Sequence, residues 1–213
     1  MIHVLDIGSN TVDGPPPYDL LEDKRVLCVE PQIEWKSDYE TLDKFVGDGQ
    51  KHIFYKCKGS GMSSLLEPNF KVLKKLPNLD DLAEILETHE IETVRLDDIK
   101  EVKRIDYLKM DVQGSELSIL RNGREKLKQS LVWDVEVSFV PLYKSQPVFG
   151  EIDLEARRQG FITATMFPKF WNGTLIEADV IYVRDYINTE LSDKQKNIIK
   201  TIIRECYGRE LCL

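Results

Sequence analysis

Apolar residues along the chain gather in short runs that alternate with segments of helical spacing. Ile2–Asp6 and Val26–Glu30 are largely apolar runs that each end in an acidic residue, as expected of strands buried on both faces. Tyr107–Asp111 reads as a further strand and Leu131–Val140 as a longer one. Strands that alternate with helices predict an α/β fold with a mostly parallel sheet flanked by helices.

Helical spacing and stop signals mark the segments between these strands. A short helix fits residues 18–24, after Gly14 and the three prolines at 15–17. Longer helices are predicted over Asn69–Leu76, over Leu79–Glu87 beyond Pro77, and over Val148–Gln159 before Gly160. A third segment, followed by turn signals, ends near Val46, and an added hairpin strand is predicted over His52–Lys58. A loop over Ser60–Ser64 and a helix after Glu116 follow. The last two strands are predicted over Phe161–Phe167 and Ala178–Val183.

The end of the chain predicts one more helix. Ser192 and Gln195 form a capping-box pattern, which an apolar stripe follows at Ile198, Ile199, Ile202 and Ile203. We therefore expect one domain over residues 1–185 and a C-terminal helical extension over 186–213 that packs on the same domain. A homodimer contact or an active-site lid is the alternative use of the stripe.

Composition limits the class of protein. A chain of 213 residues with 42% apolar and 31% charged residues suits one globular domain. A formal net charge of −8 disfavours a nucleic-acid partner. No apolar run approaches the roughly 18 residues of a membrane helix. The sequence begins directly with an apolar strand, so we expect no signal peptide. Four scattered cysteines favour reduced thiols, so we expect a cytoplasmic protein without a membrane partner.

Polar residues with binding chemistry follow the first two strands, at the sheet edge where α/β proteins bind ligands. Gly8 lets the backbone approach a ligand closely, and Asp6 can accept from an ammonium group or orient the loop. Asn10 can bond a carboxylate or a backbone group. Glu30, at the end of the second strand, is placed to accept from both ribose hydroxyls of an adenosine ligand.

A nicotinamide-dependent oxidoreductase is the competing interpretation of these strand ends. It would favour G-x-G-x-x-G, in which backbone groups and a helix N-terminus hold a pyrophosphate. This chain has Gly8 followed by Ser-Asn-Thr-Val-Asp, which suits a zwitterionic aminoacyl group better than a diphosphate. A tight turn with a helix cap is the purely structural alternative.

Six motifs, in their order and spacing, resemble the FkbM family of S-adenosylmethionine-dependent methyltransferases. The most specific is the segment Leu108–Leu120, and the resemblance extends from about residue 2 to about residue 184. The matching pieces are Leu5–Asn10, Val29–Pro31, Gly61–Leu65, Glu92–Ile99, Tyr107–Leu117 and Val135–Tyr143.

The resemblance implies a Rossmann-like class I methyltransferase fold with seven strands, of which the last is antiparallel. It implies methyl transfer from S-adenosylmethionine, usually to a hydroxyl of a sugar, a glycan or a small natural product. It also implies the roles of particular residues. The methionine end of the cofactor would be lined by Asp6, Gly8, Ser9 and Asn10, and the ribose by Glu30 and Pro31. The adenine would be lined by Val46, Gly47 and Asp48. Ser63 and Asp111 would complete the cofactor set, and Asp111 would lie near the sulfonium and the acceptor.

The chain departs from the family after its first strand. Val12 stands where many members have a second glycine, and Gly14 with the prolines at 15–17 shortens the helix that follows. In the family this helix N-terminus faces the methionine carboxylate, and we expect it to be displaced in this chain. A catalytically idle cofactor-binding or interaction protein is therefore the alternative to an active enzyme.

Methylation of a hydroxyl requires a group that removes its proton. Asp111 is the first candidate base and Glu136 the second, whereas Glu116 opens a helix and suits its N-terminus. Asp134 and Glu136 share one face of their strand, which would permit a divalent cation, but no histidine joins them and we expect no metal. Acceptor recognition is expected from residues 59–90, Pro141–Tyr143 and the aromatic segment Phe167–Gly173, whose rings could stack on a sugar.

Overall fold

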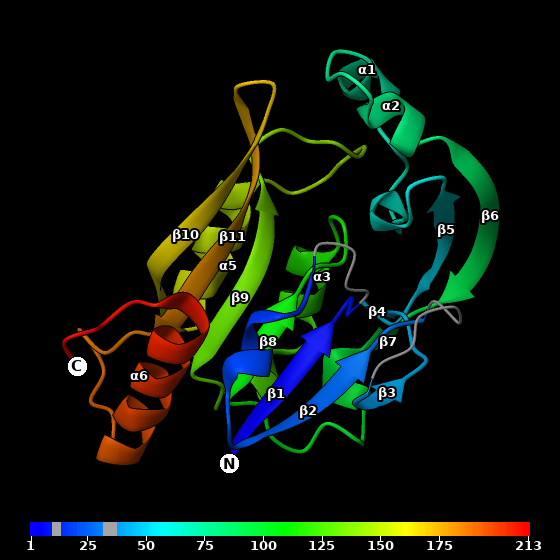
Figure 1. Ribbon diagram of the computed structural model, residues 1–213. Coiled ribbons are helices and arrows are strands. Elements are labelled where there is room, and N and C mark those ends of the chain that lie inside the picture. The colour runs from blue at the N-terminus through cyan, green and yellow to red at the C-terminus, as the bar shows by residue number, and fades with distance from the viewer. Residues whose placement is uncertain (10–13, 32–37) are drawn as a thin grey trace.

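A seven-stranded sheet forms the centre of the protein. The computed structural model describes residues 1–9, 14–31 and 38–213. The strands lie in the order β10-β11-β9-β8-β1-β2-β3 (Figure 1). They comprise β1 (Ile2–Ile7), β2 (Lys24–Val29), β3 (Glu40–Leu42), β8 (Tyr107–Met110), β9 (Val132–Ser138), β10 (Phe161–Trp171) and β11 (Thr174–Arg184).

The directions of the strands confirm the predicted fold class. β3, β2, β1, β8 and β9 are parallel to one another, and the last strand, β11, is antiparallel to both β9 and β10. Ile7 lies beside Val29 on one side and Met110 on the other, so the carboxyl ends of β1, β2 and β8 meet at one edge. That edge is where the sequence places its candidate ligand-binding residues.

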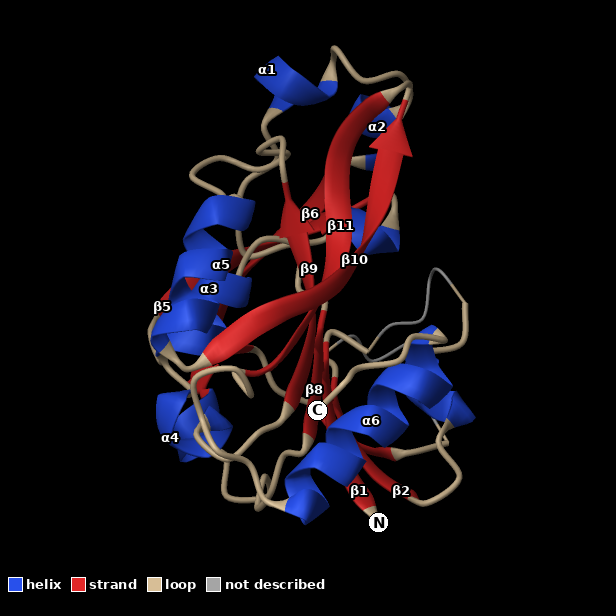
Figure 2. Ribbon diagram, turned by 90° about the vertical axis from the view of Figure 1, so that its left-hand side faces the viewer, coloured by secondary structure: helices blue, strands red, loops and turns tan. Residues whose placement is uncertain are grey.

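One face of the sheet is apolar along its whole length. Leu5, Leu108, Trp133 and Val180 all belong to the same buried cluster. Three helices cover this face, namely α3 (Glu116–Arg121), α4 (Arg124–Leu127) and α5 (Phe149–Arg158). Figure 2 shows them on the side of the sheet opposite to the C-terminal helix α6 (Asp193–Tyr207).

The opposite face changes character halfway along the strands. Near the amino ends of the parallel strands it is apolar, and Ile199, Ile202 and Ile203 of α6 are fully buried in a cluster with Val4 and Val132. The predicted capping box begins this helix, because Ser192 and Gln195 exchange side-chain and backbone hydrogen bonds. Towards the carboxyl ends, the same face presents charged side chains, among them Asp6, Lys109, Asp134 and Glu136.

A ribbon and two short helices lie beside the main sheet. β5 (Lys51–Cys57) confirms the predicted hairpin strand and pairs antiparallel with β6 (Ile85–Glu92). The helix predicted over Leu79–Glu87 was therefore wrong beyond Leu82, where α2 (Leu79–Leu82) ends. Pairing with β5 draws the following residues into a strand, although their local spacing favours a helix. The other elements of this region are β4 (Val46–Gly47), β7 (Val94–Arg95) and α1 (Phe70–Leu73).

The last two strands form a long hairpin that reaches the short helices. β10 continues to Trp171, beyond its predicted end, and turns back through Asn172 and Gly173, both with positive φ. The indole N–H of Trp171 donates to the carbonyl of Pro77 over 2.8 Å. This bond joins the hairpin tip to the segment that carries α1 and α2, which lie near it in Figure 2. Within the described ranges, no helix is long and apolar enough to cross a membrane.

We expect Ile202→Ala to lower the free energy of unfolding by about 2–5 kcal/mol, because it leaves a cavity between α6 and the sheet. Ile202 is fully buried, whereas Ile187, at 71% exposed, provides a matched control in the same C-terminal region. Urea denaturation of Ile202→Ala and Ile187→Ala measures both changes. Equal, small losses in the two variants would contradict the structural role of α6.

Candidate active site

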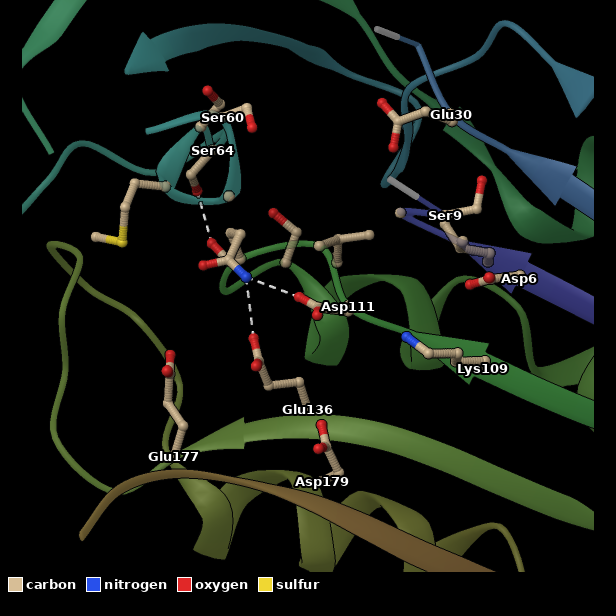
Figure 3. Close-up of a pocket in the computed structure, with 18 of the residues that line it drawn as sticks. Asp6, Ser9, Glu30, Ser60, Ser64, Lys109, Asp111, Glu136, Glu177 and Asp179 are labelled. Atoms are coloured by element: carbon tan, nitrogen blue, oxygen red, sulfur yellow. Dashed lines mark hydrogen bonds between the residues drawn. The ribbon is translucent and has the colours of Figure 1, made fainter. Parts of the chain in front are cut away.

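A cavity of about 730 Å³ opens at the carboxyl ends of the parallel strands. Its size is in the range of cavities that hold small molecules and cofactors. Figure 3 shows Ser9 and Glu30 at one end and Glu136, Glu177 and Asp179 at the other. Residues 59–65 and the hairpin residues Phe170 and Trp171 also line it, and we call these two segments the roof of the cavity.

Gly8 is required by the close approach of β1 to the end of β8. Its φ is +80°, and a Cβ at this position would lie 1.8 Å from the carbonyl oxygen of Asp111. A backbone hydrogen bond from Asp111 to Ile7 over 3.1 Å joins the end of β8 to β1, and one from Gly8 to Val29 over 3.0 Å joins the end of β1 to β2. Any side chain here would push apart the strand ends that define the cavity.

Asp6 and Ser9 are buried polar groups at the wall of the cavity. The Tyr18 hydroxyl donates to Oδ2 of Asp6 over 2.8 Å. Oδ1 of Asp6 and Oγ of Ser9 are buried and have no hydrogen-bond partner within the described part of the chain. Burial raises the pKa of Asp6, although Lys109 and the Tyr18 hydroxyl oppose that effect. Asn10, expected to act with these residues, lies outside the described residues.

The structure divides the residues that were expected at the ribose and the adenine into two groups. Glu30, Pro31 and Val46 line the cavity, and Glu30 is buried at the end of β2. Gly47 and Asp48 are not among the lining residues. The Asp48 carboxylate instead pairs with His52 over 2.8 Å and accepts from the backbone N–H of Gln50 over 3.0 Å.

Ser63 lines the cavity from the roof and also holds the roof in place. Its hydroxyl accepts from the backbone N–H of Cys57 over 3.1 Å. The neighbouring Ser64 hydroxyl donates to the carbonyl of Gln113 over 2.6 Å. These two bonds tie the roof to β5 and to the loop after β8.

Gln113 connects the two candidate bases. Its side-chain amide donates to Oδ1 of Asp111 over 2.7 Å and to Oε2 of Glu136 over 3.0 Å (Figure 3). The Tyr143 hydroxyl donates to the amide oxygen of Gln113 over 2.9 Å, which fixes the orientation of the amide. Gln113 has a φ of +56°, an uncommon conformation for a residue with a side chain. The structure therefore brings Asp111 and Glu136 together through one bridging residue.

Lys169 neutralises part of the acidic end of the cavity. Its ammonium group contacts Oε1 of Glu136 over 2.8 Å and Oδ1 of Asp179 over 3.1 Å. Burial alone would lower the pKa of Lys169, but the two carboxylates outweigh burial and raise it. Burial, together with Asp111 and Glu177, raises the pKa of Glu136 well above its usual range. Burial likewise raises the pKa of Glu177 to about 7.

A second lysine lies at the floor of the cavity, by which we mean the row Asp6, Lys109 and Asp134. Lys109 of β8 is in register with Asp6 of β1 and with Asp134 of β9, and alternation along the strands turns all three to one face. Burial would lower the pKa of Lys109, but the surrounding aspartates outweigh it and raise the pKa. The charge of this buried ammonium is thus maintained by its acidic neighbours.

Glu116 has the structural role that its position predicts. It is the first residue of α3, and its Oε1 accepts from the backbone N–H groups of Val112 and Gly114 over 3.0 and 3.1 Å. The bonds fix the loop that carries Gln113. Among the residues that the structure describes, no group of three or more His, Cys, Asp or Glu side chains is arranged to hold a metal ion.

Several residues of the cavity were missed at the level of sequence. Gln113 and Lys109 lie within the Tyr107–Leu117 motif, whose spacing could have marked them, but their partners come from other strands. Lys169 lies in the segment predicted to recognise the acceptor, where only its aromatic neighbours were considered. Glu177 and Asp179 have no local motif, since their role depends on the pairing of β11 with β9.

We expect Glu116→Gln to reduce the pH dependence of stability. Burial raises the pKa of Glu116 to about 7 from an ordinary 4.5, so the folded state binds this proton more tightly than the unfolded chain. Its contribution to stability is present below pH 4.5 and is lost as the pH rises to 7, by up to about 3 kcal/mol. Urea denaturation at several pH values across this window measures the effect.

A glutamine at this position keeps an oxygen that accepts both backbone bonds but has no proton to lose. Glu101, which is exposed, provides the control as Glu101→Gln. If Glu116→Gln keeps the full wild-type slope of stability against pH, burial of the Glu116 carboxyl is not its cause.

Several solved structures that resemble the chain are described as methyltransferases, and their sequence identity to it is low. Magnesium protoporphyrin IX methyltransferase from Synechocystis, with bound S-adenosylmethionine, has a TM-score of 0.44 and 11% identity over 85% of this chain and 69% of its own. A TehB-like methyltransferase from Corynebacterium glutamicum has a TM-score of 0.41 and 11% identity over 86% and 80%. A glycopeptide N-methyltransferase has a TM-score of 0.40 and 11% identity over 86% and 87%.

The sequence was also compared with curated proteins and with models of protein families. No curated protein matches the chain at a significant level. The model described as the methyltransferase FkbM domain matches residues 6–163, which include the ends of β1, β2, β8 and β9 around the cavity. The chain therefore belongs to the FkbM methyltransferase family.

Proposed function

We propose that this protein transfers the methyl group of S-adenosylmethionine to a hydroxyl of a sugar, a glycan or a small natural product. The observation that supports this proposal most strongly is the position of Glu30 and Asp111. They directly follow β2 and β8 and line the same cavity, in a member of a methyltransferase family. Glu30 is placed to hold the ribose and Asp111 to face the reacting groups.

The residues of the cavity fit the proposed cofactor. The Oγ of Ser9 and Oδ1 of Asp6 are buried without partners in the described part of the chain, as expected of groups that await a ligand or the loop beside it. Glu30 offers carboxylate oxygens to the ribose hydroxyls, and Val46 offers apolar surface to the adenine ring.

The charge of the cavity also suits this cofactor, which carries a net positive charge. Among the residues that the structure describes, seven carboxyl side chains and three lysines line the cavity. The carboxyl groups are Asp6, Glu30, Asp111, Asp134, Glu136, Glu177 and Asp179, and the lysines are Lys44, Lys109 and Lys169. An excess of carboxylates stabilises a cation, whereas it would repel the pyrophosphate of a nicotinamide cofactor.

The acceptor end combines an aromatic surface with hydrogen-bond acceptors. Phe170 is 63% exposed although it lines the cavity, so its ring is available to stack on a sugar. The neighbouring Trp171 donates its indole N–H to the carbonyl of Pro77, which fixes this end of the hairpin. Glu177 and Asp179 provide carboxylate oxygens for the hydroxyls of the same ligand. Together these features support a polyhydroxylated acceptor.

Catalysis in this site would consist of alignment and proton removal. S-adenosylmethionine, when bound, supplies a methyl group that is already activated by its sulfonium. Asp111 would accept the proton of the acceptor hydroxyl, while Gln113 keeps its carboxylate oriented through the 2.7 Å bond to Oδ1. Lys169, whose ammonium group contacts Oε1 of Glu136 over 2.8 Å, would limit the repulsion between Glu136 and Asp111. Residues 59–65 of the roof would cover the reacting groups and limit the access of water.

We expect the wild-type protein to bind S-adenosylmethionine and S-adenosylhomocysteine at one site, and Glu30→Ala to weaken both by about 10- to 100-fold. In this variant, the two ribose hydroxyls of the cofactor lose their charge-assisted hydrogen bonds to the carboxylate. Isothermal titration calorimetry measures the affinities, with NAD as the negative ligand. Glu22→Ala, at an exposed position near the start of β2, is the control variant.

Stronger binding of NAD than of S-adenosylmethionine would instead support the oxidoreductase alternative. No binding of any of these ligands at millimolar concentration would support an idle homologue. Either result would remove the proposed function.

We expect Asp111→Asn to lower kcat for an accepted hydroxyl substrate by about 10²- to 10⁴-fold, because an amide cannot take the proton. Release of S-adenosylhomocysteine from a panel of sugars and glycans identifies the substrate and measures kcat. Asp98→Asn, at a position away from the cavity lining, is the matched control. An undiminished kcat in Asp111→Asn would transfer the role of base to another group.

A further inference from the structure

We infer that Tyr207 of the C-terminal helix is a positioning residue of the cofactor site, because its hydroxyl holds the Asp134 carboxylate at the floor of the cavity. Tyr207 lies 44 residues beyond the end of the family match at residue 163. The inference rests on the proposed function in that the ligand is S-adenosylmethionine, and it adds a part of the chain that the family domain does not include.

The contacts of Asp134 point to α6. The Tyr207 hydroxyl donates to Oδ2 of Asp134 over 2.8 Å, and the Tyr107 hydroxyl approaches the same oxygen at 3.4 Å. The two hydroxyls also contact each other. Asp134 is 4% exposed and lines the cavity, so the last residue of α6 is one hydrogen bond away from the ligand space.

Asp134 belongs to a row of charges that spans the floor. Its strand neighbour Lys109 lies in register with it and with Asp6, and all three line the cavity. A change in the charge of Asp134 therefore acts on the buried ammonium of Lys109 and on any cation above the floor. In this arrangement, the hydrogen bond from Tyr207 influences the ligand through Asp134 without contact between Tyr207 and the ligand.

The hydroxyl of Tyr207 can be separated from the packing of its ring. The ring stacks on Phe167 with centroids 5.8 Å apart and meets Tyr107 edge-on at 6.4 Å. A phenylalanine keeps both of these contacts and loses only the hydrogen bonds. Tyr207→Phe is accordingly a test of the positioning role and not of the attachment of α6.

The direction of the effect follows from the groups around Asp134. Burial raises the pKa of Asp134 to about 6, with Lys109 opposing burial, Asp179 and Asp6 adding to it, and the hydroxyl of Tyr207 opposing it. Tyr107 and Cys206 also face this carboxyl. Tyr207 thus favours the ionised form, which attracts a cationic ligand. Without the hydroxyl, Asp134 takes up a proton at a higher pH than in the wild type.

The experiment compares cofactor affinity in wild type and Tyr207→Phe from pH 5.5 to 8.5, by calorimetry with S-adenosylmethionine and with S-adenosylhomocysteine, which lacks the sulfonium charge. We expect similar affinities at pH 8.5. Near pH 6.5, Tyr207→Phe should bind S-adenosylmethionine about tenfold more weakly than the wild type, and S-adenosylhomocysteine should lose less.

Two further variants make the result specific. Tyr182→Phe removes another buried hydroxyl, which has no hydrogen-bond partner in the described residues and belongs to the cluster on the opposite face of the sheet. Tyr182→Phe should leave the pH dependence of S-adenosylmethionine affinity as it is in the wild type. In Asp134→Asn, the floor no longer titrates at this position, so adding Tyr207→Phe should cause no further pH-dependent loss.

The outcomes separate this inference from the proposed function. If the wild type binds neither ligand, the proposed function fails and the inference with it. If the wild type binds but Tyr207→Phe has the wild-type profile, only the positioning role is overturned. A loss that is equal at every pH, or that persists unchanged in the Asp134→Asn background, would assign Tyr207 a purely structural role and overturn the inference as well.

Discussion

The period-two alternation of side chains along the central strands determines both the fold and the site. In β9, the apolar side chains of Trp133, Val135 and Val137 face α3 and α5, so Asp134 and Glu136 must face the other way. The same rule turns Lys109 of β8 and Asp179 of β11 towards the cavity. A shift of one residue in any of these strands would bury charges in the apolar core and expose that core to the cavity.

The charged part of the sheet face that lines the cavity depends on other segments of the chain, which cover it and form hydrogen bonds and ion pairs with its buried groups. Gln113 bridges Asp111 and Glu136, Lys169 arrives from the hairpin, and Tyr207 arrives from the end of the chain. Buried carboxyl groups without such partners would be costly, so each contact stabilises the fold and shapes the site at once. The family match ends at residue 163, and two of these three contributors lie beyond it.

Features that depend on residues close together in the sequence could be predicted from it, whereas features that depend on residues far apart in the sequence could not. The strand runs, the glycine after β1 and the capping box at Ser192 are local patterns, and they led to the fold class and to the cofactor end of the cavity. The strand β6 was missed because its partner β5 lies about 30 residues earlier in the chain, and pairing overrode local helical spacing. Lys169 and Tyr207 were missed as site residues because neither has a neighbour in sequence that shares its role.

The many carboxyl groups that line the cavity have a consequence for the protons that are released when a cationic ligand binds. Burial raises the pKa of Asp134 to about 6 and that of Glu177 to about 7, so protons occupy part of this face near neutral pH. A cationic ligand favours the ionised carboxylates and therefore displaces those protons into the solvent. Binding in this cavity is then an exchange of one cation for another, and its measured heat will include the ionisation enthalpy of whichever buffer takes up the released protons.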